Sequence, residues 1–90
     1  MKIRIRYFAS LREMSGESEE TLTVREGANV SDVRALLVTR YPRMQPVVER
    51  SICAVNREYV PADTLLHNGD ELVFIPPMGG GELQEKLWSH

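Results

Sequence analysis

The stretch LHNGDELVFIPPMGGG, residues 66–81, decides the predicted fold. Its centre, residues 72–75, is a continuous apolar run of the kind found in a central strand that is covered on at least one face. HNGD before it predicts a turn, because Asn68 and Gly69 are both able to take positive φ. Two prolines and three glycines follow the strand. They predict a stiff, extended connection that carries a slim and flexible tip.

The amino-terminal third predicts two strands. Residues 2–8, KIRIRYF, alternate with period two, as a half-buried strand does. Ile3, Ile5 and Tyr7 are expected on one face, and Lys2, Arg4, Arg6 and Phe8 on the other. A helical turn with Leu11 and Met14 facing inward follows, and Gly16 ends it. Residues 18–25 alternate again, so the two strands predict an antiparallel hairpin.

The middle of the chain changes to helical periodicity. Five apolar residues recur at helical spacing within residues 30–41: Val30, Val33, Leu36, Leu37 and Tyr41. Ser31 is the expected N-cap, and Pro42 is expected to stop the helix. Residues 43–50 are predicted to be irregular. Residues 51–60 predict a strand, a break at residues 56–58 and a second short strand.

The order strand, strand, helix, strand, short strand, strand predicts an α+β fold. We expect a mixed sheet of about four to five strands with one main helix packed on one face. This is the element order of the β-grasp, or ubiquitin-like, architecture; a ferredoxin-like fold needs one more helix. The expected division is a β-grasp domain over residues 1–78, a glycine tail over residues 79–81 and an extension over residues 82–90.

Composition excludes several classes of function. Eleven Lys and Arg stand against thirteen Asp and Glu, so the net charge of −2 argues against a nucleic-acid partner. No segment approaches the roughly 20 apolar residues of a membrane span, and we expect a cytoplasmic protein. Cys53 is the only cysteine and is expected to be a buried structural thiol. No spacing predicts a metal site, a bound cofactor or a catalytic cluster, so we expect no enzyme activity of the chain on its own.

The glycine run has a specific chemical use. A backbone without side chains fits a narrow channel into another protein's active site. If the chain ends at a glycine, its carboxylate is open to adenylation and then to attack by a sulfur or nitrogen nucleophile. The alternative interpretation is a simple linker to a disordered tail.

Four segments carry a resemblance to a known family. IRYFASLREMSG, VSDVRALL, AVNREYV and LHNGDELVFIPPMGGG occur in the family's order, and the GDE…PP…GG ending is the specific part. The chain resembles the small, sulfur-carrying subunit of molybdopterin synthase over about residues 1–81.

The resemblance implies a protein cosubstrate with no catalytic side chains of its own. Gly81 is implied as the sulfur-bearing terminus, with Gly80 as the other half of the pair. The implied partners are an ubiquitin-activating-like adenylyltransferase, which uses ATP, and the large synthase subunit. That subunit would use the resulting thiocarboxylate to add sulfur to a cyclic pyranopterin precursor. The expected contacts with the large subunit are Phe8, Tyr59, Ile75, Pro76, Pro77, Met78 and Gly79, although Phe8 and Ile75 also fit a plain core role.

Residues 82–90, ELQEKLWSH, depart from the family pattern. With them attached, Gly81 lies inside a peptide bond and has no carboxylate. Leu83 and Leu87 are four residues apart, and Trp88 adds a large apolar surface. Three hypotheses remain open: a propeptide removed by a protease after Gly81, a non-carrier module that binds through the intact tail, and a sulfur carrier or protein modifier of another pathway.

Overall fold

The computed structural model describes residues 1–77. Its strands are β1 (Lys2–Arg6), β2 (Glu19–Thr23), β3 (Ile52–Val55), β4 (Glu58–Val60) and β5 (Glu71–Ile75). Its helices are α1 (Ser10–Ser15), α2 (Val30–Arg40), the 3₁₀ turn η1 (Pro42–Met44) and α3 (Gln45–Val48). The predicted glycine tail and extension, together with Met78, lie outside the described residues.

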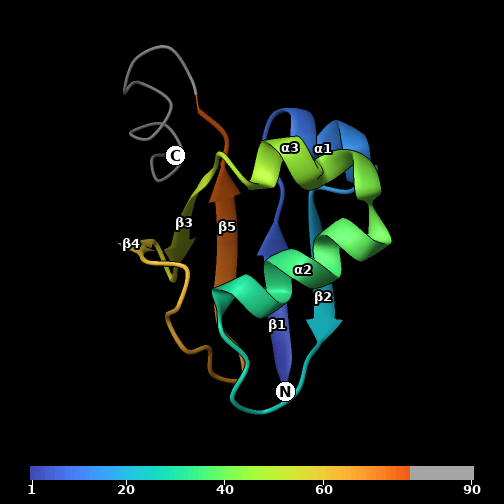
Figure 1. Cartoon of the computed structure of the whole chain (residues 1–90). Coiled ribbons are helices and arrows are strands. Elements are labelled where there is room, and N and C mark those ends of the chain that lie inside the picture. The colour runs from blue at the N-terminus through green and yellow to red at the C-terminus, as the bar shows by residue number, and fades with distance from the viewer. Residues whose placement is uncertain (78–90) are drawn as a thin grey trace.

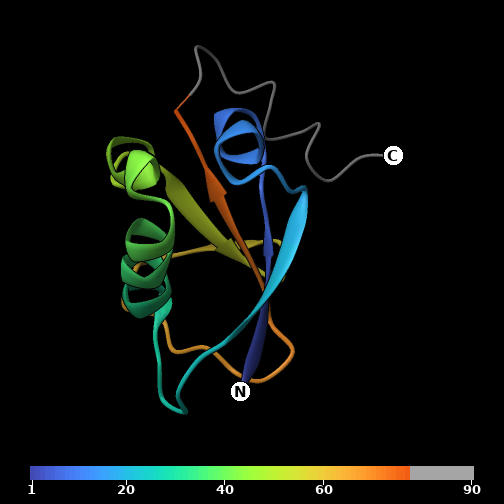
Figure 2. The ribbon, with the colours of Figure 1, turned by 90° about the vertical axis from the view of Figure 1, so that its right-hand side faces the viewer.

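The strands form one sheet in the order β2-β1-β5-β3-β4. β1 and β5 run parallel, and the other neighbours are antiparallel. α2 lies across one face of this sheet in Figure 1, and Figure 2 shows α2 and α3 on the same side of it. The predicted β-grasp is therefore confirmed, with β5 as the central strand.

The main core lies between the sheet and α2. Ile3, Ile5 and Tyr7 are buried as their alternation predicts, and α2 contributes Val33 and Leu37 from its inner side. β5 divides its apolar run between the two faces. Leu72 and Phe74 join this core, whereas Val73 and Ile75 belong to a second cluster on the opposite face.

The start of α2 differs from the prediction, because the N-cap is Asn29 and not Ser31. The Asn29 side chain accepts a hydrogen bond from the backbone N–H of Asp32 at 2.9 Å. The Asp32 carboxylate in turn accepts the backbone N–H of Asn29 at 2.9 Å. This reciprocal capping box satisfies both of these N–H donors, so Ser31, two residues later, is not needed as a cap.

One further local prediction was wrong, and two other positions add detail to the predictions. Residues 43–50 are largely helical, because Pro42 and Pro46 occupy first-turn positions where a missing N–H costs nothing. Leu36 shares the helical spacing but lies 45% exposed. In the turn before β5 only Gly69 has positive φ; Asn68 instead uses its side chain to accept the backbone N–H of Lys2.

A partly buried polar cluster ties the end of α2 to the sheet. Glu20 on β2 accepts hydrogen bonds from the Tyr7 hydroxyl at 2.6 Å and the Tyr41 hydroxyl at 3.1 Å. Arg40 forms an ion pair with the same carboxylate at 3.0 Å. Burial, followed by the hydrogen bond to Glu20, raises the pKa of Tyr7 well above its usual range, and the same causes raise the pKa of Tyr41.

Candidate functional site

The root of the carboxyl-terminal tail is held in place by packing. Pro76 directly follows β5 and is buried, and Pro77 is exposed. A hollow of about 220 Å³ beside them is lined by Ser10, Pro46, Val47, Arg50, Pro76 and Pro77. The prolines thus lie between the start of α1 and α3, so the direction in which the chain leaves the sheet is fixed.

The sheet face opposite α2 carries a second set of apolar residues. Strand register places Arg6, Val73, Ala54 and Tyr59 in one row across β1, β5, β3 and β4. Ile75 and Ile52 are paired in the next row. We call this surface the open face and define it by Arg6, Phe8, Ile52, Ala54, Tyr59, Val73 and Ile75.

The open face is partly buried and partly exposed. Ala54, Val73 and Ile75 form its buried centre, and Phe8 packs against them. Ile52 and Tyr59 form its exposed side, at 44% and 49% exposure. Side chains of this size left half exposed side by side are a common feature of surfaces that bind another molecule.

Phe8 is held at the edge of this surface by two features. The Arg6 guanidinium lies 5.0 Å from the centre of its ring, in a cation–π contact. Ala9, the next residue, has a φ of 51°, which is unusual for a residue with a side chain. Backbone in such a conformation is held by its surroundings, so the path that leads from β1 into α1 is well determined.

Basic side chains lie beside the apolar surface. Arg4 and Arg6 share a single carboxylate, that of Glu71, at 3.5 Å and 3.9 Å. Lys2 extends the stripe, and Glu19 lies opposite Arg6 in the register. Lys2, Arg4 and Arg6 therefore form a basic stripe along β1, and its positive charge is only partly balanced.

The structure brings most of the predicted contact residues together. Phe8, Tyr59 and Ile75 lie on the open face, and Pro76 and Pro77 continue from it. Ile75 is only 2% exposed, so it supports this surface from within, as its core interpretation predicts. Met78, Gly79, Gly80 and Gly81 lie outside the described residues, and their roles stay predictions.

Ile52 is the half-exposed apolar residue of the open face that the sequence prediction missed. The signal that could have found it is the alternation within ICAV, residues 52–55, which assigns successive residues of this strand to opposite faces of the sheet. Cys53 and Val55 join the main core, whereas Ile52 and Ala54 point to the open face.

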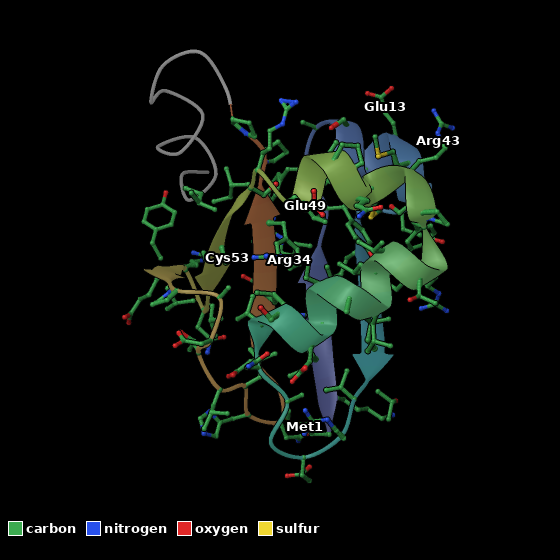
Figure 3. The ribbon with its side chains drawn as sticks, in the orientation of Figure 1. Met1, Glu13, Arg34, Arg43, Glu49 and Cys53 are labelled. Carbon is green, nitrogen blue, oxygen red and sulfur yellow. The ribbon has the colours of Figure 1, made fainter. Side chains whose placement is uncertain are left out.

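Cys53 is buried, as predicted. Figure 3 shows it on β3 beside Arg34 of α2, whose guanidinium lies 3.7 Å from the sulfur. Within residues 1–77, no group of three or more His, Cys, Asp and Glu side chains is arranged to hold a metal ion. None of the described helices is both long and apolar enough to pass through a membrane.

Comparison with known proteins identifies the family. The model of the ThiS family matches residues 5–81. The chain belongs to the ThiS family. The match covers all of the described structure from Ile5 onward, includes the three glycines and stops at Gly81. Residues 82–90 lie beyond it.

Members of known function are similar over nearly their whole length. The molybdopterin synthase sulfur carrier subunit of Chlamydomonas reinhardtii is 39% identical over 83 residues, covering 90% of this chain and 100% of that protein. The subunit of the same name from Mycobacterium tuberculosis is 35% identical, covering 90% of this chain and 99% of that protein.

Solved structures show the same fold. A putative molybdopterin converting factor subunit 1 from Pyrococcus furiosus has a TM-score of 0.79 at 30% identity, covering 87% of this chain and 99% of that one. A chain from a complex of subunits 1 and 2 of the Helicobacter pylori molybdopterin-converting factor has a TM-score of 0.67 at 20% identity. That match covers 90% of this chain and 100% of the other.

Proposed function

We propose that this protein is the sulfur-carrier subunit of a molybdopterin synthase, and that Gly81 bears the sulfur once residues 82–90 are removed. The observation that carries the proposal is the family match, which runs through the glycine tail and stops at Gly81. The two relatives that bear the name of sulfur carrier subunit support it. The packed proline root supports it too, because it fixes the point at which the tail leaves the sheet.

The proposed chemistry takes place at the carboxylate of Gly81. Cleavage of the Gly81–Glu82 bond by a protease frees this group. An activating enzyme of the ubiquitin-activating type joins the carboxylate to the α-phosphate of ATP, and pyrophosphate leaves. A sulfur nucleophile then attacks the acyl carbon and AMP leaves, which yields a thiocarboxylate. Glycine suits both steps because it adds no bulk beside the reacting carbon.

The proposed acceptor complex is formed with the large synthase subunit. The sulfur passes there to the cyclic pyranopterin precursor, while the small subunit supplies no catalytic side chain. We assign the contact to Phe8, Tyr59 and the segment from Ile75 to Gly79. The open face supplies apolar area for this contact. The H. pylori chain of the same fold comes from a complex of subunits 1 and 2.

Reconstitution with purified components tests the proposal. A chain ending at Gly81 is incubated with its host's activating enzyme, ATP and a sulfide source, and its intact mass is measured. We expect one oxygen to be replaced by sulfur. The matched control ends at Gly80, so that it differs by one glycine, and we expect it to gain less sulfur. Failure of the chain ending at Gly81 to gain sulfur contradicts the proposal.

A second candidate function follows from residues 82–90. If they are retained, Gly81 stays in a peptide bond and the chain acts as a binding module rather than as a carrier. Addition of the large subunit distinguishes a sulfur carrier from a binding module. A carrier ending at Gly81 supports pyranopterin sulfuration, whereas a module binds its partner only with residues 82–90 in place. A carrier or modifier of another pathway gains sulfur but fails in the sulfuration assay.

A further inference from the structure

We propose that residues 82–90 bind back onto the open face of their own domain and cover it. The open face is the surface of the sheet that no described helix covers, apart from α1 at its upper edge (Figure 2). Its buried centre is apolar, and Ile52 and Tyr59 beside it are about half exposed. Residues 82–90 carry large apolar side chains and follow the central strand by only a few residues. They are therefore the segment of this chain best placed to cover the open face.

The geometry of the chain allows this return. β5 is the central strand and pairs directly with β3, and β3 pairs with β4. Ile52 faces Ile75 at the end of β5 and so lies one strand spacing, or about 5 Å, from the place where the tail leaves, and Tyr59 lies on the next strand. The four residues from Met78 to Gly81 span up to about 14 Å when extended. Three of them are glycines, which allow a tight change of direction.

The side chains of the segment match the surface. Leu83 and Leu87 are four residues apart, so one turn of helix places them on one side. Trp88 follows directly and widens that apolar side. Nine residues are too few to hold a helix in water on their own. Burial against Ile52 and Tyr59 is the kind of tertiary contact that stabilises a short amphipathic segment.

Charge favours the same arrangement. The stripe of Lys2, Arg4 and Arg6 is opposed on the sheet by Glu71 and Glu19, which leaves an excess of one positive charge. Residues 82–86, ELQEK, carry two glutamates and one lysine, which leaves an excess of one negative charge. Such complementary charges orient a segment on a surface more than they hold it there.

The consequence for activity rests on the proposed function. Removal of residues 82–90 would free the Gly81 carboxylate and, in the same step, uncover the surface assigned to the large subunit. The uncut chain would then be inactive for two separate reasons. The docking itself concerns only this chain's own residues and holds or fails without any sulfur transfer.

Fluorescence of Trp88 tests the docking directly, because it is the only tryptophan of the chain. We measure quenching by acrylamide in the full chain and in a free peptide of residues 82–90. We expect several-fold weaker quenching and a blue-shifted emission in the full chain, because a docked indole is shielded from water and quencher. Quenching equal to that of the free peptide overturns the proposal.

Two variants locate the binding surface. Ile52→Thr removes a 44% exposed apolar side chain from the open face, and Leu36→Thr removes a 45% exposed one from α2. Strong quenching is expected to return in Ile52→Thr but not in Leu36→Thr, with circular dichroism confirming that both remain folded. An equal response of the two variants contradicts the assignment. So does protection of Trp88 that vanishes on dilution, because a second copy would then be the binding surface. A docked Trp88 in the full chain, together with a chain ending at Gly81 that gains no sulfur, would refute the proposed function and leave the docking intact.

Discussion

The two faces of the sheet use the same kinds of residue for different ends. On the helix side, Ile3, Ile5 and Phe74 are fully covered by α2 and its neighbours. On the open side, Ala54, Val73 and Ile75 are buried, but Ile52 and Tyr59 beside them remain half exposed. The first face holds the fold together. The second contributes less to stability and, in our account, is kept for binding.

The largest effect expected from this difference concerns the helix face. Leu37→Ala leaves a cavity under α2, where the side chain is fully buried. We expect a loss of about 3 kcal/mol in the free energy of unfolding. Equilibrium denaturation in urea measures it. A loss below about 1 kcal/mol would mean that α2 packs more loosely than the structure shows.

The polar cluster on the helix side gives the next largest effect. Tyr7→Phe removes a partly buried hydrogen bond to the charged Glu20 carboxylate, and we expect a loss of about 2 kcal/mol. The Tyr7 hydroxyl also predicts a pH dependence, because its pKa is raised in the folded state. Above the usual tyrosine pKa of about 10, the unfolded chain releases this proton and the folded chain keeps it, so stability falls as pH rises.

Denaturation midpoints between pH 8 and pH 11 measure this dependence, with Tyr59→Phe as the matched control because that hydroxyl is on the exposed side of the sheet. The decline is expected to be shallower in Tyr7→Phe and unchanged in Tyr59→Phe. Equal slopes in the two variants would remove Tyr7 from the explanation.

The cap of α2 gives a smaller effect. Asn29→Ala breaks the capping box with Asp32, and we expect it to cost about 1 kcal/mol. Ser31→Ala, two residues further along, serves as the control and is expected to change the stability little. If the two substitutions are equally costly, Asn29 is not the dominant cap.

The smallest effect on stability is expected on the open face. Tyr59→Thr replaces a half-exposed residue on the edge strand β4 with another good strand former, so a change of about 0.5 kcal/mol or less is expected. The same change is expected to weaken binding of the Gly81-ended chain to the large subunit, measured by calorimetry. A variant that loses stability but binds normally would reverse the roles of the two faces.

Periodicity was sufficient to predict most of the fold. Alternation assigned Ile3, Ile5 and Tyr7 to the core, and the continuous run of β5 marked it as central. The N-cap of α2 was harder to predict from the sequence. Ser31 and Asn29 are both good caps, and only the backbone conformation of Asn29 decides between them. Leu36 fits the helical spacing, but the sheet does not extend far enough to cover it.

Within the candidate site, the proline and glycine segment was predictable from the sequence, and the open face was less so. The glycines and prolines are adjacent in sequence, so their pattern is local and can be read directly. The open face joins β1, β3, β4 and β5, and its composition depends on strand order and register. Tyr59 and Ile52 come together only because β3 pairs with both β4 and β5.

The intact mass of the protein recovered from its native cells tests the central claim most directly. The account predicts a chain that ends at Gly81, with a fraction in which one oxygen is replaced by sulfur. Recovery of only those molecules that continue beyond Gly81, from cells with active molybdopterin synthase, would contradict it. The glycine run would then be a linker, and the function would lie in what residues 82–90 bind.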